Sequence, residues 1–135
     1  MKNLIFLISI FLLIACKQVP KTTGDTYFYL DQNNNSYSIT KNEIQYNPMT
    51  AKNSSSGVYN GGKKATITLT KEQFIDIAQR AETLLQNKDY QADKREMQTA
   101  VLSTQRDGFI IKRVLKKSEF RNQFETLLKK LLKQE

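Results

Sequence analysis

Residues Gly57 to Lys64 (GVYNGGKK) have the spacing of a phosphate-binding P-loop, in which four residues separate Gly57 from the Gly62-Lys63 pair. A P-loop lysine is followed by a serine or threonine that binds Mg²⁺, and by a helix whose N-terminus faces the phosphate. Here Lys64 takes the place of that hydroxyl residue, and residues 65–70 have the alternating pattern of a strand. We therefore predict that this segment binds no nucleotide.

The surrounding stretch, residues 49–64, is small and polar, and it has two interpretations. A glycine-rich segment before a strand can be a simple connector. Long loops are nevertheless uncommon in small domains unless they have a function, and tyrosine provides contact area in binding loops at low entropic cost. On the second interpretation, the candidate partner-binding residues are Tyr59, Asn60, Lys63 and Lys64.

The composition excludes several kinds of catalytic site. The chain has no histidine and one cysteine, so a Ser-His-Asp triad, a cysteine-rich or histidine-based zinc site and an intramolecular disulfide are excluded. The helix dipole explains Glu72 and Asp76 near a predicted helix start, and the serines at 54–56 have no histidine base. We expect no catalytic residues, no metal and no cofactor.

The net charge of +8 is concentrated toward the C-terminus. Residues 112–135 contain eight basic and three acidic residues, and Lys129, Lys130 and Lys133 form a candidate basic patch. Lysines at the end of a helix can simply occupy a solvated face that suits the helix dipole. They can also bind an anionic surface, such as lipid headgroups or an acidic protein. We expect no nucleic-acid binding, because no binding module is recognisable.

The N-terminus has the pattern of an export signal. Lys2 supplies a positive charge, and residues 4–14 are apolar except for Ser9. As a helix, these 11 residues would rise about 16 Å, well short of the ~30 Å hydrocarbon core of a bilayer. A charged start, a short apolar core and a small residue are typical of a secretory signal peptide.

The end of this signal, Leu13-Ile14-Ala15-Cys16, resembles the lipobox of bacterial lipoproteins. The resemblance implies cleavage between Ala15 and Cys16, and acylation of Cys16 with palmitate-type chains. It further implies residues 1–15 as signal peptide, residues 16–24 as a lipidated tether and residues 25–135 as a single domain in the bacterial cell envelope. Lys17 follows the cysteine in place of an aspartate, which favours the outer membrane, facing the periplasm or the surface.

The first part of the exported chain predicts strands and then a helix. Residues 26–30 are rich in aromatic residues, and the pairs Tyr37/Ile39 and Ile44/Tyr46 alternate with polar residues, as in half-buried strands. Another strand is predicted at 65–70. Thr70 and Gln73 match a capping box, and the apolar stripe that follows predicts a helix to about Gln86.

The second part predicts a hairpin and a final helix. After a charged stretch at 87–96, strands are expected at 99–103 and 109–114, with a turn at 106–108 that contains Asp-Gly. Ser118 can cap a helix whose apolar face is Phe120, Phe124, Leu127, Leu128, Leu131 and Leu132.

This order of strands, helix, hairpin and helix predicts an α+β fold, with an antiparallel sheet of about five or six strands and two amphipathic helices on one face. The functional hypothesis is a lipid-anchored, non-catalytic envelope protein that binds another envelope or secreted protein, as an assembly factor, inhibitor or immunity-type protein. The alternative is a binder of membrane surfaces or polyanions that uses the basic C-terminal helix.

Overall fold

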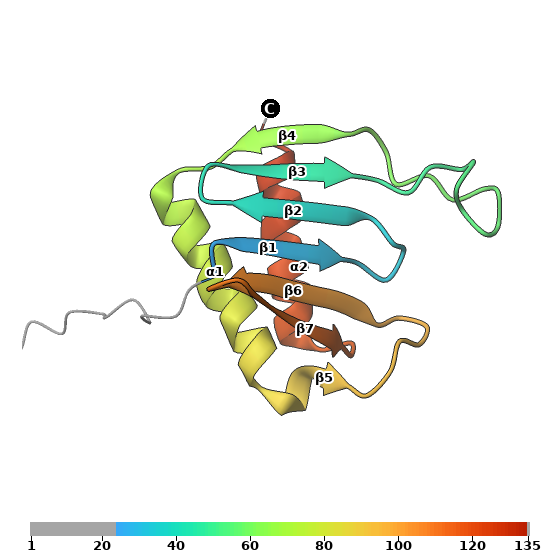
Figure 1. Ribbon diagram of the computed structural model, residues 1–135. Coiled ribbons are helices and arrows are strands. Elements are labelled where there is room, and N and C mark those ends of the chain that lie inside the picture. Colours follow the sequence, from blue (N-terminus) through green and yellow to red (C-terminus); the bar gives the residue numbers. More distant parts are fainter. Residues whose placement is uncertain (1–23, 135) are drawn as a thin grey trace, which may run out of the picture.

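A computed structural model describes residues 24–134, so the predicted signal peptide, the lipobox-like segment and Cys16 lie outside the described residues. The described chain folds into one antiparallel sheet of seven strands with two α-helices behind it (Figure 1). The elements are β1 (Thr26–Leu30), β2 (Ser36–Thr40), β3 (Glu43–Asn47), β4 (Ala65–Thr68), α1 (Lys71–Gln86), the 3-10 helix η1 (Lys88–Tyr90), β5 (Gln91–Ala92), β6 (Ala100–Arg106), β7 (Phe109–Leu115) and α2 (Glu119–Leu132).

The strand order is β4-β3-β2-β1-β6-β7-β5. Strands β1 to β4 form a meander, and the β6–β7 hairpin pairs with the free side of β1, with Thr26 opposite Gln105 and Leu30 opposite Val101. Both helices cover the same face of the sheet (Figure 1). The predicted α+β class and the order of elements are confirmed.

One hydrophobic core lies between the sheet and the helices, because alternate strand residues point to the helical side. The opposite face of the sheet carries mostly serine, threonine and other polar residues, and neither helix of residues 24–134 covers it. The buried core residues include Tyr27, Tyr29, Tyr37, Ile39, Ile44, Phe74, Ile77, Leu84, Leu102, Leu115, Phe124 and Leu128. The helices therefore pack against one face of the sheet, and only turns and loops lie at the two ends of its strands.

Both predicted helix starts are confirmed. The capping box is complete, because Thr70 Oγ1 accepts from Gln73 N at 3.2 Å and Gln73 Oε1 accepts from Thr70 N at 2.8 Å. The Ser118 hydroxyl caps α2. Within residues 24–134, neither helix has the length and hydropathy that crossing a bilayer would require.

The sheet has seven strands instead of the five or six expected, and β4 and β6 end at other residues than predicted. The additional strand β5 is two residues long and lies within the charged stretch at 87–96, for which no strand was predicted. Strand β4 ends at Thr68, because Leu69 and Thr70 lead into the helix cap. Strand β6 continues to Arg106, because the Asp107-Gly108 turn needs only two residues, both with positive φ (49° and 77°).

Candidate functional site

The sheet has two ends with different connections. At the entry end, β1 begins next to the turn at 41–42 and the turn at 107–108. At the loop end, the turn at 31–35 follows β1 and the long segment 48–64 joins β3 to β4. Figure 1 shows the long segment projecting from the side opposite to the point where β1 begins. The candidate site lies at the loop end.

A cleft of about 300 Å³ at the loop end brings together residues from four parts of the chain. We call it the tyrosine cleft, and its lining residues are Asp31, Asn33, Asn35, Tyr37, Tyr46, Tyr59, Gly61, Lys129, Leu132 and Lys133. It unites a residue of the predicted partner-binding loop, Tyr59, with two of the three predicted patch lysines.

The turn at 31–35 forms the rigid floor of this cleft. The buried Asp31 carboxylate accepts from the backbone N–H groups of Asn33 and Asn35, at 2.8 and 2.9 Å, and from Asn35 Nδ2 at 2.8 Å. Asparagine and aspartate commonly close turns in this way. Both carboxylate oxygens are therefore engaged within the turn, so Asp31 acts as a structural acceptor.

Asn35 also holds the long segment in place. Its Nδ2 donates to Tyr59 Oη at 2.8 Å, and its Oδ1 accepts from Met49 N at 2.9 Å. Gly61 fits closely, because a Cβ there would lie 2.1 Å from Asn35 Oδ1, and its carbonyl accepts from Tyr46 Oη at 2.8 Å. The segment is thus docked against the sheet, and Tyr59 is half-buried.

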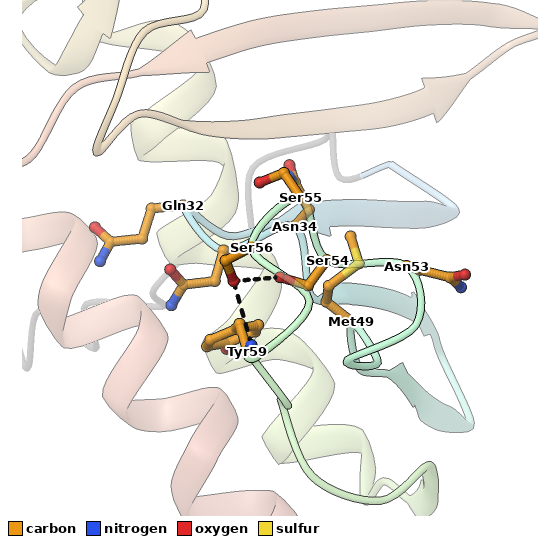
Figure 2. A pocket seen from close by; sticks show the side chains of 9 residues that line it. Gln32, Asn34, Met49, Asn53, Ser54, Ser55, Ser56 and Tyr59 are labelled. Carbon is orange, nitrogen blue, oxygen red and sulfur yellow. Dashed lines mark hydrogen bonds between the residues drawn. The ribbon is translucent and has the colours of Figure 1, made fainter.

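A second hollow, which we call the serine pocket, lies beside the cleft and has a volume of about 330 Å³ (Figure 2). It is lined by Gln32, Asn33, Asn34, Met49, Asn53, Ser54, Ser55, Ser56 and Tyr59. Asn33 and Tyr59 line both hollows. The Ser56 hydroxyl interacts with Ser54 Oγ at 3.0 Å and accepts from Tyr59 N at 3.4 Å. The serines therefore help to order the loop.

The predicted site residues separate into two groups. Lys129 and Lys133 are one helical turn apart, so they lie on the same face of α2 and reach the tyrosine cleft. Lys130 lies on another face and lines a different hollow with Arg80. The remaining loop residues, Asn60, Lys63 and Lys64, are exposed and line neither the cleft nor the serine pocket.

Two arginines that the sequence does not single out brace the same turn. Arg95 Nη2 donates to the carbonyl of Asp31 at 3.1 Å and to Asn34 Oδ1 at 2.9 Å. Arg121, which is 1% exposed, donates from Nη1 to the carbonyl of Gln98 at 2.7 Å and from Nη2 to Gln32 Oε1 at 3.3 Å. These contacts tie the turn to α2 and to the segment before β6.

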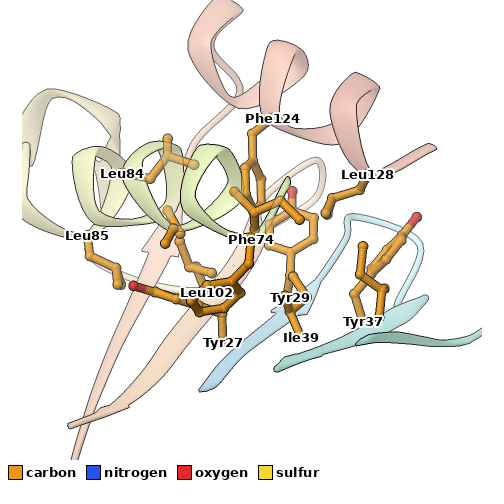
Figure 3. Close-up of a cluster of buried hydrophobic side chains, with 14 of the residues drawn as sticks. Tyr27, Tyr29, Tyr37, Ile39, Phe74, Leu84, Leu85, Leu102, Phe124 and Leu128 are labelled. Carbon is orange, nitrogen blue, oxygen red and sulfur yellow. The ribbon is translucent and has the colours of Figure 1, made fainter. Parts of the chain in front are cut away.

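Buried tyrosines support the cleft from the core side. Tyr29 and Tyr37 point from the sheet toward the helices (Figure 3), and their rings lie 5.9 Å apart. Burial raises the pKa of both hydroxyls, and the nearby Glu125 carboxylate raises that of Tyr29 further. Burial also raises the pKa of Tyr46. The hydroxyls of Tyr29, Tyr37 and Tyr46 are therefore protonated at neutral pH and act as hydrogen-bonding groups.

The acidic residues considered as catalytic candidates do not converge on the cleft. Asp76 is bound to Arg80 at 2.8 Å on the surface of α1, while Glu72 lies in the first turn of that helix. In the described part of the chain, no three carboxylates are grouped closely enough to hold a metal ion. The P-loop-like segment leads into β4, so no helix N-terminus follows it.

Comparisons with models of known protein families, with curated proteins and with solved structures found no match for this chain.

Proposed function

We propose that this protein is a lipid-anchored, non-catalytic protein of the bacterial cell envelope that binds another envelope or secreted protein at the loop end of the sheet. The observation that carries the proposal is the convergence of Tyr59, Lys129 and Lys133 on one cleft. The anchor is Cys16, whose sequence context resembles a lipobox.

The composition of the loop end supports a protein partner. The segment 48–64 and the turn at 31–35 consist largely of asparagine, serine, glycine and tyrosine, which are the residues that binding loops use for adaptable hydrogen bonds and rigid contact area. Two large apolar side chains at this end, Val58 and Met97, are 82% and 90% exposed. Polar loops with a few exposed apolar side chains suit a partner surface.

The charge of the cleft favours an acidic partner. Two lysines line it, while its carboxylate, Asp31, is already engaged by three donors within its own turn. A glutamate or aspartate of the partner would therefore meet ammonium groups and hydrogen-bond donors. Because the turn and loop are held by Asn35, little ordering is needed upon binding, which favours affinity.

The lysines provide a matched test between this function and the alternative, a general polyanion or membrane-surface binder. Lys129→Glu and Lys130→Glu change the net charge equally, one residue apart on α2, but only Lys129 lines the cleft. We expect Lys129→Glu, and equally Lys133→Glu, to weaken co-purification of the partner from crosslinked cells at least roughly tenfold, as for loss of a central interface residue. Lys130→Glu should retain binding. An equal effect of all three reversals would instead support the polyanion binder.

The anchor is tested separately. Cys16→Ser should leave the protein unacylated, with its signal uncleaved by the lipoprotein signal peptidase. Wild-type protein should partition into the detergent phase because two or three acyl chains hold a protein firmly at a membrane. Unchanged partitioning and processing of the Cys16→Ser variant would contradict the anchor.

A further inference from the structure

The point at which the chain enters the domain is fixed by a buried carboxylate. Gly24 N donates to Tyr27 Oη at 2.9 Å, and Tyr27 Oη donates to Glu82 Oε1 at 2.7 Å. Glu82 is 4% exposed, and it also accepts from Arg106 Nη2 at 2.5 Å. Because Arg106 immediately precedes the Asp107-Gly108 turn, this network ties the chain entry to the tip of the β6–β7 hairpin.

The hairpin tip exposes two consecutive large apolar side chains. Phe109 is 75% exposed and Ile110 is 74% exposed. Neighbouring residues of a strand point to opposite faces of the sheet, so the tip is apolar on both sides. The turn before them is a tight two-residue connection, so the two side chains form an apolar wedge at the very end of the hairpin.

The rest of the entry end contains a hollow whose apolar lining comes from the half-buried Ile75 and the buried Leu69 and Phe74. This hollow of about 520 Å³ lies between the turn at 41–42 and the start of α1, lined by Leu69, Phe74 and Ile75 together with Lys41, Asn42 and Lys71. Charges at this end are mixed, since Lys41 pairs with Asp25 at 3.4 Å. The entry end therefore carries charges of both signs, and its most exposed large apolar side chains are Phe109 and Ile110.

We propose that the entry end of the domain lies against the lipid bilayer, with Phe109 and Ile110 inserted into its interfacial layer. The inference rests on the proposed anchor at Cys16. Seven residues lie between Cys16 and Gly24, and the eight Cα-to-Cα steps from one to the other span at most about 28 Å, so the entry end cannot move far from the membrane surface. The wedge then contacts lipid, and the tyrosine cleft at the opposite end of the sheet faces away from the membrane toward the partner.

Tryptophan fluorescence can test this orientation, because the chain contains no tryptophan. Phe109→Trp places a probe on the wedge, and Val58→Trp places an equally exposed probe in the loop at the opposite end. The full lipidated chains, extracted from cell membranes, would be reconstituted into phosphatidylcholine vesicles with brominated acyl chains. We expect the Phe109→Trp emission to shift to shorter wavelength and to be quenched several-fold more strongly than the Val58→Trp emission.

Equal quenching of the two probes in vesicle-bound protein would overturn the orientation, while leaving the anchor and the protein-binding proposal intact. Failure of both chains to float with the vesicles would overturn the orientation together with the anchor. No partner protein is present, so neither result depends on the proposed protein binding. Ile110→Trp repeats the measurement from the other side of the wedge, and the same quenching is expected from it.

Discussion

Removal of the Asn35 side chain should destabilise the loop end and release the segment 48–64 from the sheet. Asn35→Ala deletes three hydrogen bonds, one each to Asp31, Tyr59 and Met49. A net contribution of about 1 kcal/mol per bond, with more for the bond to the carboxylate, predicts a loss of about 3 kcal/mol. For a urea dependence near 2 kcal/mol per molar, the unfolding midpoint would fall by about 1.5 M.

Asn33→Ala is the matched control for this measurement. Asn33 lies in the same turn and lines the same cleft, but it is exposed and contributes to the Asp31 network through its backbone N–H. Its replacement should cost less than about 0.5 kcal/mol. Urea unfolding, together with amide exchange across residues 48–64, would measure both variants. A similar loss of stability in the two variants, or unchanged amide exchange of residues 48–64 in Asn35→Ala, would show that the Asn35 side chain does not hold the segment.

Three further outcomes follow from the contacts described above. The free energy of unfolding should fall as the pH rises above about 10, because tyrosines of the unfolded chain lose their protons near that pH while burial keeps the hydroxyl of Tyr37 protonated in the folded protein. Tyr37→Phe should reduce this pH dependence by up to about 1.4 kcal/mol per pH unit. Urea titrations from pH 9 to 12 would measure it. Arg106→Met should lower the free energy of unfolding by about 2 kcal/mol, because Glu82 loses a charged partner. Amide exchange at Asp25 should accelerate in this variant, and unchanged exchange would contradict a fixed chain entry. Gly61→Ala should displace the segment 48–64, because its Cβ would overlap Asn35 Oδ1, and a spectrum by NMR that shows no shift at Tyr59 would contradict this close fit.

The fold was largely predictable because its local signals agree with its packing. The Thr70–Gln73 capping box, the Asp107-Gly108 turn and the two apolar stripes each match the observed element. Strand β5 could not be predicted, since two residues are too few to show a period, and its pairing with Val114 and Leu115 depends on the position of β7. The burial of Arg121 could not be predicted from the sequence either, because an arginine on an amphipathic helix is ordinarily a surface residue.

Individual residues of the candidate site could be predicted from the sequence, but their meeting in one cleft could not. Tyr59 and the lysines were recognisable from residue type, and the four-residue spacing of Lys129 and Lys133 already places them on one helix face. Their meeting depends on contacts between residues far apart in sequence, such as that of Asn35 with Tyr59. The one local signal for the floor of the cleft is the Asp31-to-Asn35 spacing, which is typical of a side-chain-closed turn.

Crosslinking in intact cells would show whether a partner binds at the tyrosine cleft. A photoreactive residue at Ser55, in the serine pocket, would be compared with one at Thr66, an exposed position on the uncovered face of the sheet. We expect one discrete crosslinked protein from position 55 and none from position 66. The crosslink from position 55 should be lost in a Lys129→Glu background but not in Lys130→Glu. The same products from both positions, or a crosslink from position 55 that survives Lys129→Glu and Lys133→Glu together, would contradict binding at the tyrosine cleft.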